Sequence, residues 1–161
     1  MNKIGLLSDT HGWLNPKIAQ YFSDCNEIWH AGDIGSLEVI NELEKIALVR
    51  AVYGNIDGLD VRYATSEKLS FEIEKVKVFI THIGGYPGKY VHSVEKEIKL
   101  YQPKLFISGH SHILKVMWDK NYNLLHINPG AAGQSGFHTK QTIVTFIVDG
   151  EQISDLMVIE L

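Results

Sequence analysis

Short apolar segments alternate with amphipathic ones through the first third of the chain. The apolar runs Ile4–Ser8, Ile28–His30 and Val49–Tyr53 have the length of buried strands. Between them, Pro16–Cys25 and Leu37–Ile46 place apolar residues at helical spacing, so we predict a helix over each. Strands that alternate with helices predict parallel strand pairing through helical crossovers.

The second half of the chain carries mostly strand patterns. Leu69–Glu74 alternates and is followed by Val76–Thr81, which predicts a hairpin. Asp149-Gly150 predicts a second hairpin turn. The remaining predicted elements are a helix at His92–Leu100 and strands at Lys104–Ser108, Leu114–Trp118, Leu124–Asn128, Thr142–Val148 and Ile153–Ile159. We expect an α/β fold of two packed sheets with helices outside, in a single domain over residues 1–161.

Polar side chains gather directly after five of the predicted strands. The carboxyl ends of parallel strands in an α/β sheet converge on one crevice where ligands bind, so the five clusters should meet in space. Glycine beside the acidic residues lets the backbone turn sharply near a bound group. The clusters read Ser8-Asp9-Thr10-His11-Gly12, His30-Ala31-Gly32-Asp33, Tyr53-Gly54-Asn55-Ile56-Asp57, Thr81-His82 and Ser108-Gly109-His110-Ser111-His112.

These clusters contain enough ligand-type side chains for two metal ions. On extended backbone, residues two apart such as Asp9 and His11, or His110 and His112, point to the same side. Seven ligands are too many for one tetrahedral zinc, whereas two metals roughly 3.5–4 Å apart, bridged by a carboxylate and a hydroxide, would use them all. Mixed nitrogen and oxygen donors favour Mn, Fe, Zn, Ni or Co over Ca or Mg. The candidate ligands are Asp9, His11, Asp33, Asn55, His82, His110 and His112.

Each motif taken alone has an ordinary structural explanation. A lone D-x-H can be accidental, Gly-Asn and Gly-Asp are common in turns, and His82 alone could be a core histidine. The G-H-S-H motif is more specific, because two close histidines after a buried strand are uncommon without a ligand. The occurrence of all five clusters at strand ends is what favours a metal site.

Composition limits the cellular compartments and the kinds of binding partner that we expect for this protein. The formal net charge of -4 at pH 7 gives no support for general nucleic-acid binding, which usually needs a basic face. Cys25 is the one cysteine, so no intrachain disulfide forms. The first apolar run is too short for a signal peptide core, and no stretch is long enough to span a membrane. We therefore expect a cytoplasmic protein without a membrane partner.

The order D-x-H, G-D, G-N, H and G-H-x-H, from Asp9 to Gly130, resembles the calcineurin-like metallophosphoesterase superfamily. The short length and the Asn128-Pro129-Gly130 loop resemble its small single-domain phosphodiesterase branch. The resemblance implies a four-layer α/β/β/α sandwich of two mixed β-sheets flanked by helices. It also implies two divalent metal ions, with Mn preferred and Ni, Fe, Zn or Co as alternatives, and a small phosphorylated substrate.

The resemblance also implies a role for each ligand position. Catalysis would be in-line attack on the phosphoryl group by a metal-bridging hydroxide, with Asp33 and Asn55 at the reacting centre. Asp57 would orient a neighbouring ligand without touching a metal. The first metal would be held by Asp9, His11 and His112, the second by Asn55, His82 and His110, with Asp33 bridging the two.

One position departs from the family pattern. Many members carry a histidine after Gly-Asn that helps the leaving group depart, and here that residue is Ile56. A general-acid effect of about 10²–10⁴-fold is then missing, which favours diesters or good leaving groups. The alternatives are a phosphomonoesterase or nucleotide pyrophosphatase using the same site, and a catalytically silent scaffold of the same fold, as in the retromer coat.

Several polar and aromatic residues remain outside the ligand set. His138 and Lys140 lie in a polar loop near the proposed site and are candidate substrate contacts. Trp13 and the segment Tyr86–Tyr90 are candidates for the pocket rim, or for packing against neighbouring loops. The pattern is compatible with a homo-oligomer but marks no interface.

Overall fold

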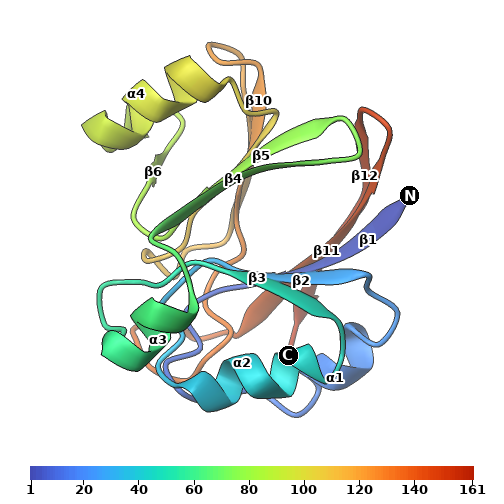
Figure 1. The fold of residues 1–161 in the computed structure, drawn as a ribbon, viewed down its shortest axis with the longest axis vertical. Helices are drawn as coiled ribbons and strands as arrows, with labels where there is room; N and C mark the ends of the chain where they lie inside the picture. The colour runs from blue at the N-terminus through green and yellow to red at the C-terminus, as the bar shows by residue number, and fades with distance from the viewer.

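A computed structural model describes all residues from Met1 to Leu161 as two five-stranded mixed sheets packed together, with helices on both outer faces (Figure 1). The first sheet has the order β12-β11-β1-β2-β3. Its three N-terminal strands pair in parallel, as the alternating pattern predicts, and β11 and β12 pair antiparallel at one side. The bounds are β1 Asn2–Leu7, β2 Glu27–His30, β3 Leu48–Ala51, β11 Thr142–Asp149 and β12 Gln152–Glu160.

The second sheet has the order β4-β5-β8-β10-β9. The central strands β5, β8 and β10 pair in parallel, while the edge strands β4 and β9 pair antiparallel. A two-stranded hairpin of β6 and β7 stands beside this sheet. The bounds are β4 Lys68–Ile73, β5 Val76–Thr81, β6 Gly85–Tyr86, β7 Lys89–Tyr90, β8 Leu105–Ile107, β9 Lys115–Asp119 and β10 Leu124–Asn128.

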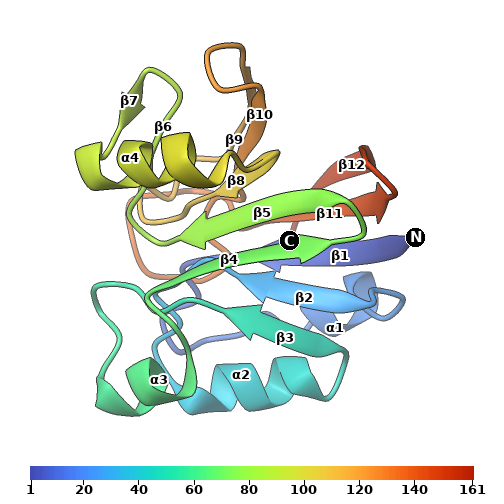
Figure 2. The same ribbon diagram turned by 45° about the horizontal axis from the view of Figure 1, so that its top comes forward.

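Three apolar clusters bind the layers together. The largest lies between the sheets, where Trp29 of β2 packs edge-on against Phe71 and Phe146. A second joins the first sheet to α1, α2 and α3, and a third joins the second sheet to α4 (Figures 1 and 2). The helices are α1 Ile18–Tyr21, α2 Leu37–Glu44, α3 Leu59–Ala64 and α4 His92–Tyr101. This arrangement confirms the four-layer sandwich, and no helix has the length and apolar character needed to cross a membrane.

Some elements differ from the sequence prediction. The helix predicted over Pro16–Cys25 is reduced to α1, because the backbone leaves helical geometry at Phe22 and then turns toward β2, where the Asn26 amide bonds to the Lys3 carbonyl. The hairpin turn predicted at Asp149-Gly150 lies one residue later, since Asp149 still pairs with Gln152 in the ladder. The segment of α3 was not predicted to be helical.

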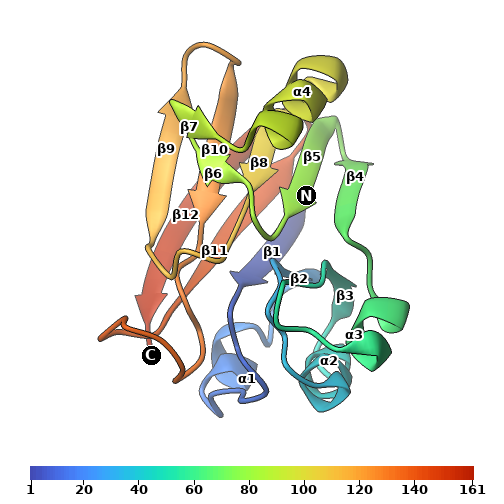
Figure 3. The ribbon, with the colours of Figure 1, turned by 90° about the vertical axis from the view of Figure 1, so that its left-hand side faces the viewer.

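The topology brings the ends of strands from both sheets to one edge. Figure 3 views that edge, where the carboxyl ends of β1, β5 and β8 point toward a common centre. The polar clusters follow β1, β2, β3, β5 and β8, so each begins where a parallel strand leaves its sheet. This placement positions the candidate site.

Candidate metal centre

Backbone hydrogen bonds hold the first two site loops side by side beyond the ends of their strands. The Asp9 amide donates to the Gly32 carbonyl at 2.9 Å, and the His11 amide donates to the Asp33 carbonyl at 3.0 Å. The Gly12 amide continues the series to the carbonyl of the residue after Asp33, at 2.7 Å. The strand pairing of β1 and β2 is thus extended into the loops, which fixes the side chains of Asp9 and Asp33 near each other.

The site residues converge through left-handed backbone rather than through extended backbone. This corrects the reasoning for the D-x-H and H-x-H pairs, because left-handed turns, not strand alternation, aim these side chains. Asp, Asn and His tolerate that region better than other non-glycine residues, which is consistent with the residue types present. The φ values are 55° at Asp9, 49° at His11, 52° at Asp33, 70° at His110 and 60° at His112.

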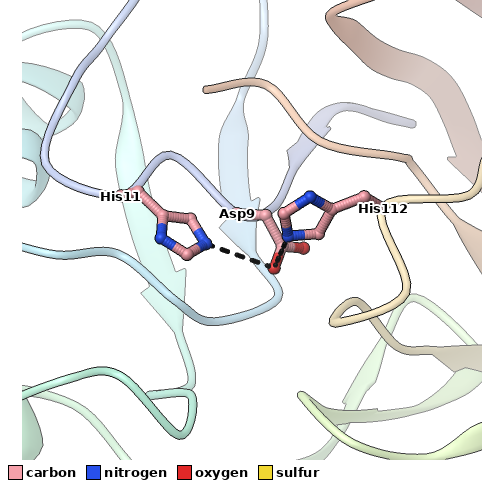
Figure 4. Close-up of side chains that lie close together, drawn as sticks. All are labelled: Asp9, His11 and His112. Carbon is pink, nitrogen blue, oxygen red and sulfur yellow. Dashed lines mark ion pairs between the residues drawn. The ribbon is translucent and has the colours of Figure 1, made fainter. Parts of the chain in front are cut away.

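Two groups of ligand-type side chains form in this way. In the first group, His112 Nε2 lies 3.2 Å and His11 Nε2 lies 3.9 Å from the Oδ1 atom of Asp9 (Figure 4). The second group contains Asp33, His82 and His110. In each group the ligand atoms all lie within 4.8 Å of one another.

Asn55 and Asp33 complete and connect the two groups. The Oδ1 atom of Asn55 lies 3.1 Å from His110 Nδ1, which adds the amide to the second group. Asp33 faces both groups, with Oδ2 3.5 Å from His11 Nε2 and Oδ1 3.2 Å from His82 Nε2. All seven side chains predicted as ligands are therefore brought together, and one carboxylate stands between the two groups.

The donor atoms in this cluster fit divalent cations. His82 Nδ1 lies 2.7 Å from the Ala31 carbonyl, so it carries the proton and leaves the Nε2 lone pair facing Asp33. Asp9 Oδ1, His11 Nε2 and His82 Nε2 are buried without a hydrogen-bond partner. Ligands about 2.1 Å from one ion lie roughly 3.0–3.4 Å apart, a range that includes the 3.2 Å from His112 to Asp9 and the 3.2 Å from His82 to Asp33. Lone pairs that face one another at such distances are stabilised by a cation.

The carboxylates also raise the affinity of this site for protons. Burial lowers the pKa of His82, but Asp33 and Asp9 outweigh that effect and raise it above the ordinary 6.5. The hydrogen-bonding Asp9 carboxylate raises the pKa of His112 in the same way. Because a histidine ligand must lose its proton to bind a metal, protons and cations compete for the same atoms.

We expect the affinity for Mn²⁺ to fall steeply as the pH drops below 6.5. Both His82 and His112 have raised pKa values, so both are protonated there and two protons must leave when the metal binds. The loss should approach about 100-fold per pH unit. Calorimetric titration with Mn²⁺ at constant ionic strength between pH 5.5 and 8 measures it. An affinity independent of pH would contradict these two histidines as ligands.

Asp57 fastens the loops that carry Asp33 and Asn55. Its Oδ2 accepts hydrogen bonds from the amides of Ile34 at 3.1 Å and Gly54 at 2.8 Å, and its Oδ1 accepts one from Gly35 at 2.7 Å. The carboxylate is 4% exposed, and all three of these hydrogen bonds come from backbone amides rather than from ligand-type side chains. Asp57 therefore positions the backbone next to Asp33 and Asn55.

Hydrogen bonds of Ser8 and His30 hold the Asp9 side chain and the first two site loops in place. The Ser8 hydroxyl donates to Asp9 Oδ2 at 2.6 Å, and the His110 amide donates to the same oxygen at 3.1 Å, leaving Oδ1 free to face the imidazoles. His30 is fully buried, and burial lowers its pKa to about 4, so it is neutral. It accepts from the Gly32 amide and bonds to the Thr10 hydroxyl, which ties the first two site loops together.

His138 orients His112. Its Nε2 lies 2.7 Å from the Gly133 carbonyl and therefore carries a proton, so its Nδ1 accepts the proton of His112 Nδ1 at 3.1 Å. This leaves the Nε2 lone pair of His112 facing Asp9. Gly136 has a φ of 127°, and a Cβ there would meet both rings, so only glycine lets the loop pass this closely. His138, predicted as a substrate contact, thus lies against His112 in the structure.

Replacing His138 with Ala should weaken metal binding about 10–100-fold, the usual cost of losing a group that orients a ligand. His138→Gln, which keeps a side-chain acceptor for the His112 proton, should recover part of the loss. Metal titration of the purified variants measures both effects. His92→Ala is the matched control, because His92 is exposed at the start of α4. Equal affinity in His138→Ala and wild type would exclude this role.

The other predicted contacts lie differently. Lys140 is exposed and forms an ion pair with Glu160 at 2.9 Å, which draws its ammonium toward β12. Trp13 is half-buried in the loop after His11, and Tyr86 is exposed on the hairpin. The role of Lys140 in substrate binding stays a prediction, and its ion pair with Glu160 does not support it.

Sequence reasoning assigned no role to three residues that shape the centre, namely Arg62, Asn128 and Ser8. Arg62 of α3 donates to the Asp57 carbonyl at 2.6 Å and lies over the Tyr53 ring, so it braces the Asn55 loop. Asn128 donates to the Gly109 carbonyl at 3.0 Å and braces the loop of the last two histidines. The Asn-Pro-Gly sequence signals a turn there, whereas nothing in the sequence marks Arg62 or the Ser8 contact.

Comparisons with known proteins identify the family and the fold of this chain. A model of the calcineurin-like phosphoesterase superfamily domain matches residues 2–151. A probable metallophosphoesterase of Methanothermobacter thermautotrophicus is 29% identical over 160 residues, which cover 93% of this chain and 88% of that protein. A second probable metallophosphoesterase, from Methanocaldococcus jannaschii, is 30% identical over 80% of this chain and 67% of its own length.

Solved structures show the same fold. An archaeal phosphodiesterase matches with a TM-score of 0.71 and 29% identity over 98% of this chain and 99% of its own. Vps29 of Chaetomium thermophilum has a TM-score of 0.79 over 100% of this chain and 94% of its own, but at 12% identity it shows the fold alone. The resemblance found in the motifs is confirmed: this protein belongs to the calcineurin-like phosphoesterase superfamily.

Proposed function

We propose that this protein is a phosphodiesterase that acts at a dinuclear metal centre, with Mn²⁺ as the preferred ion. The observation that carries the proposal is the position of Asp33, whose two carboxylate oxygens face histidines of the two different ligand groups. A carboxylate so placed suits a pair of ions better than a single one. When bound, two divalent cations neutralise phosphoryl charge and activate water for in-line attack.

The residues of this chain would then bind and orient the reacting groups. Asp9, His11 and His112 would hold one ion, Asn55, His82 and His110 the other, and Asp33 both. The hydrogen bonds of His82 to Ala31 and of His112 to His138 present the Nε2 lone pairs inward. The Ser8 hydroxyl and the His110 amide hold the second oxygen of Asp9 outward. These contacts fix the donor atoms before any ion arrives, which lowers the cost of organising the site.

The residue that follows Asn55 favours diester substrates. Ile56 is 46% exposed and has no proton to give, so its side chain cannot assist a poor leaving group. A diester with a good leaving group needs no such assistance, whereas a simple alkyl monoester does. This argument, together with the likeness to an archaeal phosphodiesterase, favours diesters over monoesters and pyrophosphates as substrates of this centre.

Hydrolysis of bis(4-nitrophenyl) phosphate tests the proposal. Metal-stripped protein should be inactive, and added Mn²⁺ should restore cleavage, with the alkyl monoester ethyl phosphate cleaved more slowly because its leaving group needs a proton. The exposed variant His92→Ala should behave as wild type, which controls for handling of the protein. Faster cleavage of the monoester would favour a phosphomonoesterase. Silence of the folded protein with Mn²⁺, Ni²⁺, Co²⁺ and Zn²⁺ would favour the non-catalytic scaffold.

A further inference from the structure

A cavity of about 190 Å³ lies directly beside the candidate metal centre. The ring of His110 forms part of its wall, so the cavity adjoins the second ligand group. The other walls come from the segment after β5, from the β6–β7 hairpin and from β10. Ile83, Val91 and Ile113 line it with apolar surface and are all partly exposed, which leaves the cavity accessible.

His126 stands in the wall of this cavity without a partner. It is fully buried on β10, stacks on Phe106 with the ring centroids 5.2 Å apart, and neither ring nitrogen has a hydrogen-bond partner. Burial lowers its pKa to about 4, against smaller opposing influences from the Phe106 backbone and Asp119. The neutral ring therefore offers one donor and one acceptor. A buried polar side chain without partners is unfavourable for folding, so a ligand group that pairs with His126 would remove that cost.

The size of the cavity limits what can occupy it. A volume of about 190 Å³ corresponds to roughly six water molecules, and an engineered apolar cavity of about 150 Å³ binds benzene. One substituted aromatic ring fits, while a dinucleotide or an acyl chain is too large. The Lys115 ammonium lies 4.1 Å from the centre of the Tyr86 ring at the edge of the same cavity, which adds an aromatic and a cationic side chain to the wall.

We propose that this cavity is a substrate subsite that takes one planar heteroaromatic ester substituent of the phosphodiester, with its polar edge against His126. The proposal rests on the proposed function, because the subsite takes its substrate from the adjoining metal centre. The apolar walls would contact the faces of the ring, and one of the unpartnered nitrogens of His126 would pair with a ring heteroatom or an exocyclic group. His126 would thus contribute to specificity.

Non-hydrolysable phosphonates test the subsite by binding rather than by turnover. We expect the Mn²⁺-loaded protein to bind phenylphosphonate at least about tenfold more tightly than methylphosphonate, because burial of the ring adds apolar contact. Pyridylphosphonates should include an isomer that binds more tightly than phenylphosphonate, by about threefold or more, through His126. Calorimetric titration gives each dissociation constant.

Two variants separate the parts of the subsite. Ile113→Trp should fill the cavity and abolish the preference for the aromatic ligands. Val116→Trp is the control, because Val116 is an exposed aliphatic residue on the face of β9 opposite Lys115 and does not line the cavity. His126→Leu should keep the preference for phenyl over methyl, lose the preference for pyridyl over phenyl, and raise the midpoint of thermal unfolding by about 2–6 °C.

The results distinguish this proposal from the proposed function. Equal affinity for phenylphosphonate and methylphosphonate, or no binding of either, overturns the subsite even if the diester is hydrolysed. A pyridyl preference that survives His126→Leu overturns the role of His126. A third result is also possible, in which the protein prefers aromatic phosphonates, loses that preference in Ile113→Trp, and hydrolyses no diester. That result overturns the phosphodiesterase activity and the proposed substrate, and leaves the cavity as a binding site for aromatic phosphonates.

Discussion

The Asp33→Asn variant should lose hydrolysis of bis(4-nitrophenyl) phosphate by more than about 100-fold. Loss of a group that only orients a metal ligand costs about 10–100-fold in affinity or activity, so loss of a carboxylate that faces both ligand groups should cost more. Burial raises the pKa of Asp33, but His82, the Ile56 amide and His11 lower it on balance, so the wild-type group is an anion. The amide of asparagine removes that charge while keeping the shape.

The variant should remain folded, which makes the loss interpretable. Asp33 has a φ of 52°, and asparagine tolerates left-handed backbone at least as well as aspartate. Mn²⁺ should raise the midpoint of thermal unfolding of the wild type, and should raise that of Asp33→Asn much less. Glu27→Gln is the control, because Glu27 is a buried carboxylate paired with Arg50 at the start of β2, the strand that precedes the Asp33 loop. Wild-type rates from Asp33→Asn in metal-controlled buffer would remove Asp33 from its role.

Most strands of this fold can be predicted from the sequence, because strands that are buried in the structure carry short runs of apolar residues. Leu124–Asn128 is predicted with the same bounds that β10 has, because Leu124, Leu125 and Ile127 place apolar side chains on both faces of a strand that is covered on both sides. The α3 helix escapes prediction for the opposite reason. Its Leu59 and Tyr63 are 71% and 86% exposed, and Val61 is its one buried residue, so no apolar stripe marks the helix.

The candidate site is predictable in its residue types but not in its geometry. Asp9, His11 and the other ligand-type residues stand out because carboxylates and imidazoles follow strand ends, and the fold brings them together. Their left-handed backbone cannot be deduced from spacing, because the turns depend on loop pairing between β1 and β2. The pairing of His138 with His112 depends on a loop joined to the site only in three dimensions.

Asp57→Asn should damage both stability and activity, because Asp57 is the joint between two site loops. Its carboxylate accepts three backbone hydrogen bonds, and the asparagine amide would turn a donor toward at least one of those amides. Leaving buried donors without partners should lower the free energy of unfolding by about 2–4 kcal/mol. The loops would then hold Asp33 and Asn55 less accurately, and a displacement of about 1 Å can cost about 100-fold in rate.

Urea unfolding of the metal-free protein and hydrolysis of bis(4-nitrophenyl) phosphate measure the two effects separately. Asp60→Asn is the matched control: Asp60 lies three residues further on, is exposed, and bonds to the Val61 amide, so its loss should change stability by less than about 1 kcal/mol. The two readouts also distinguish positioning from chemistry. A group at the reacting centre would lower the rate and leave the metal-free stability intact, whereas the bonds of Asp57 to Ile34, Gly35 and Gly54 require both to fall together.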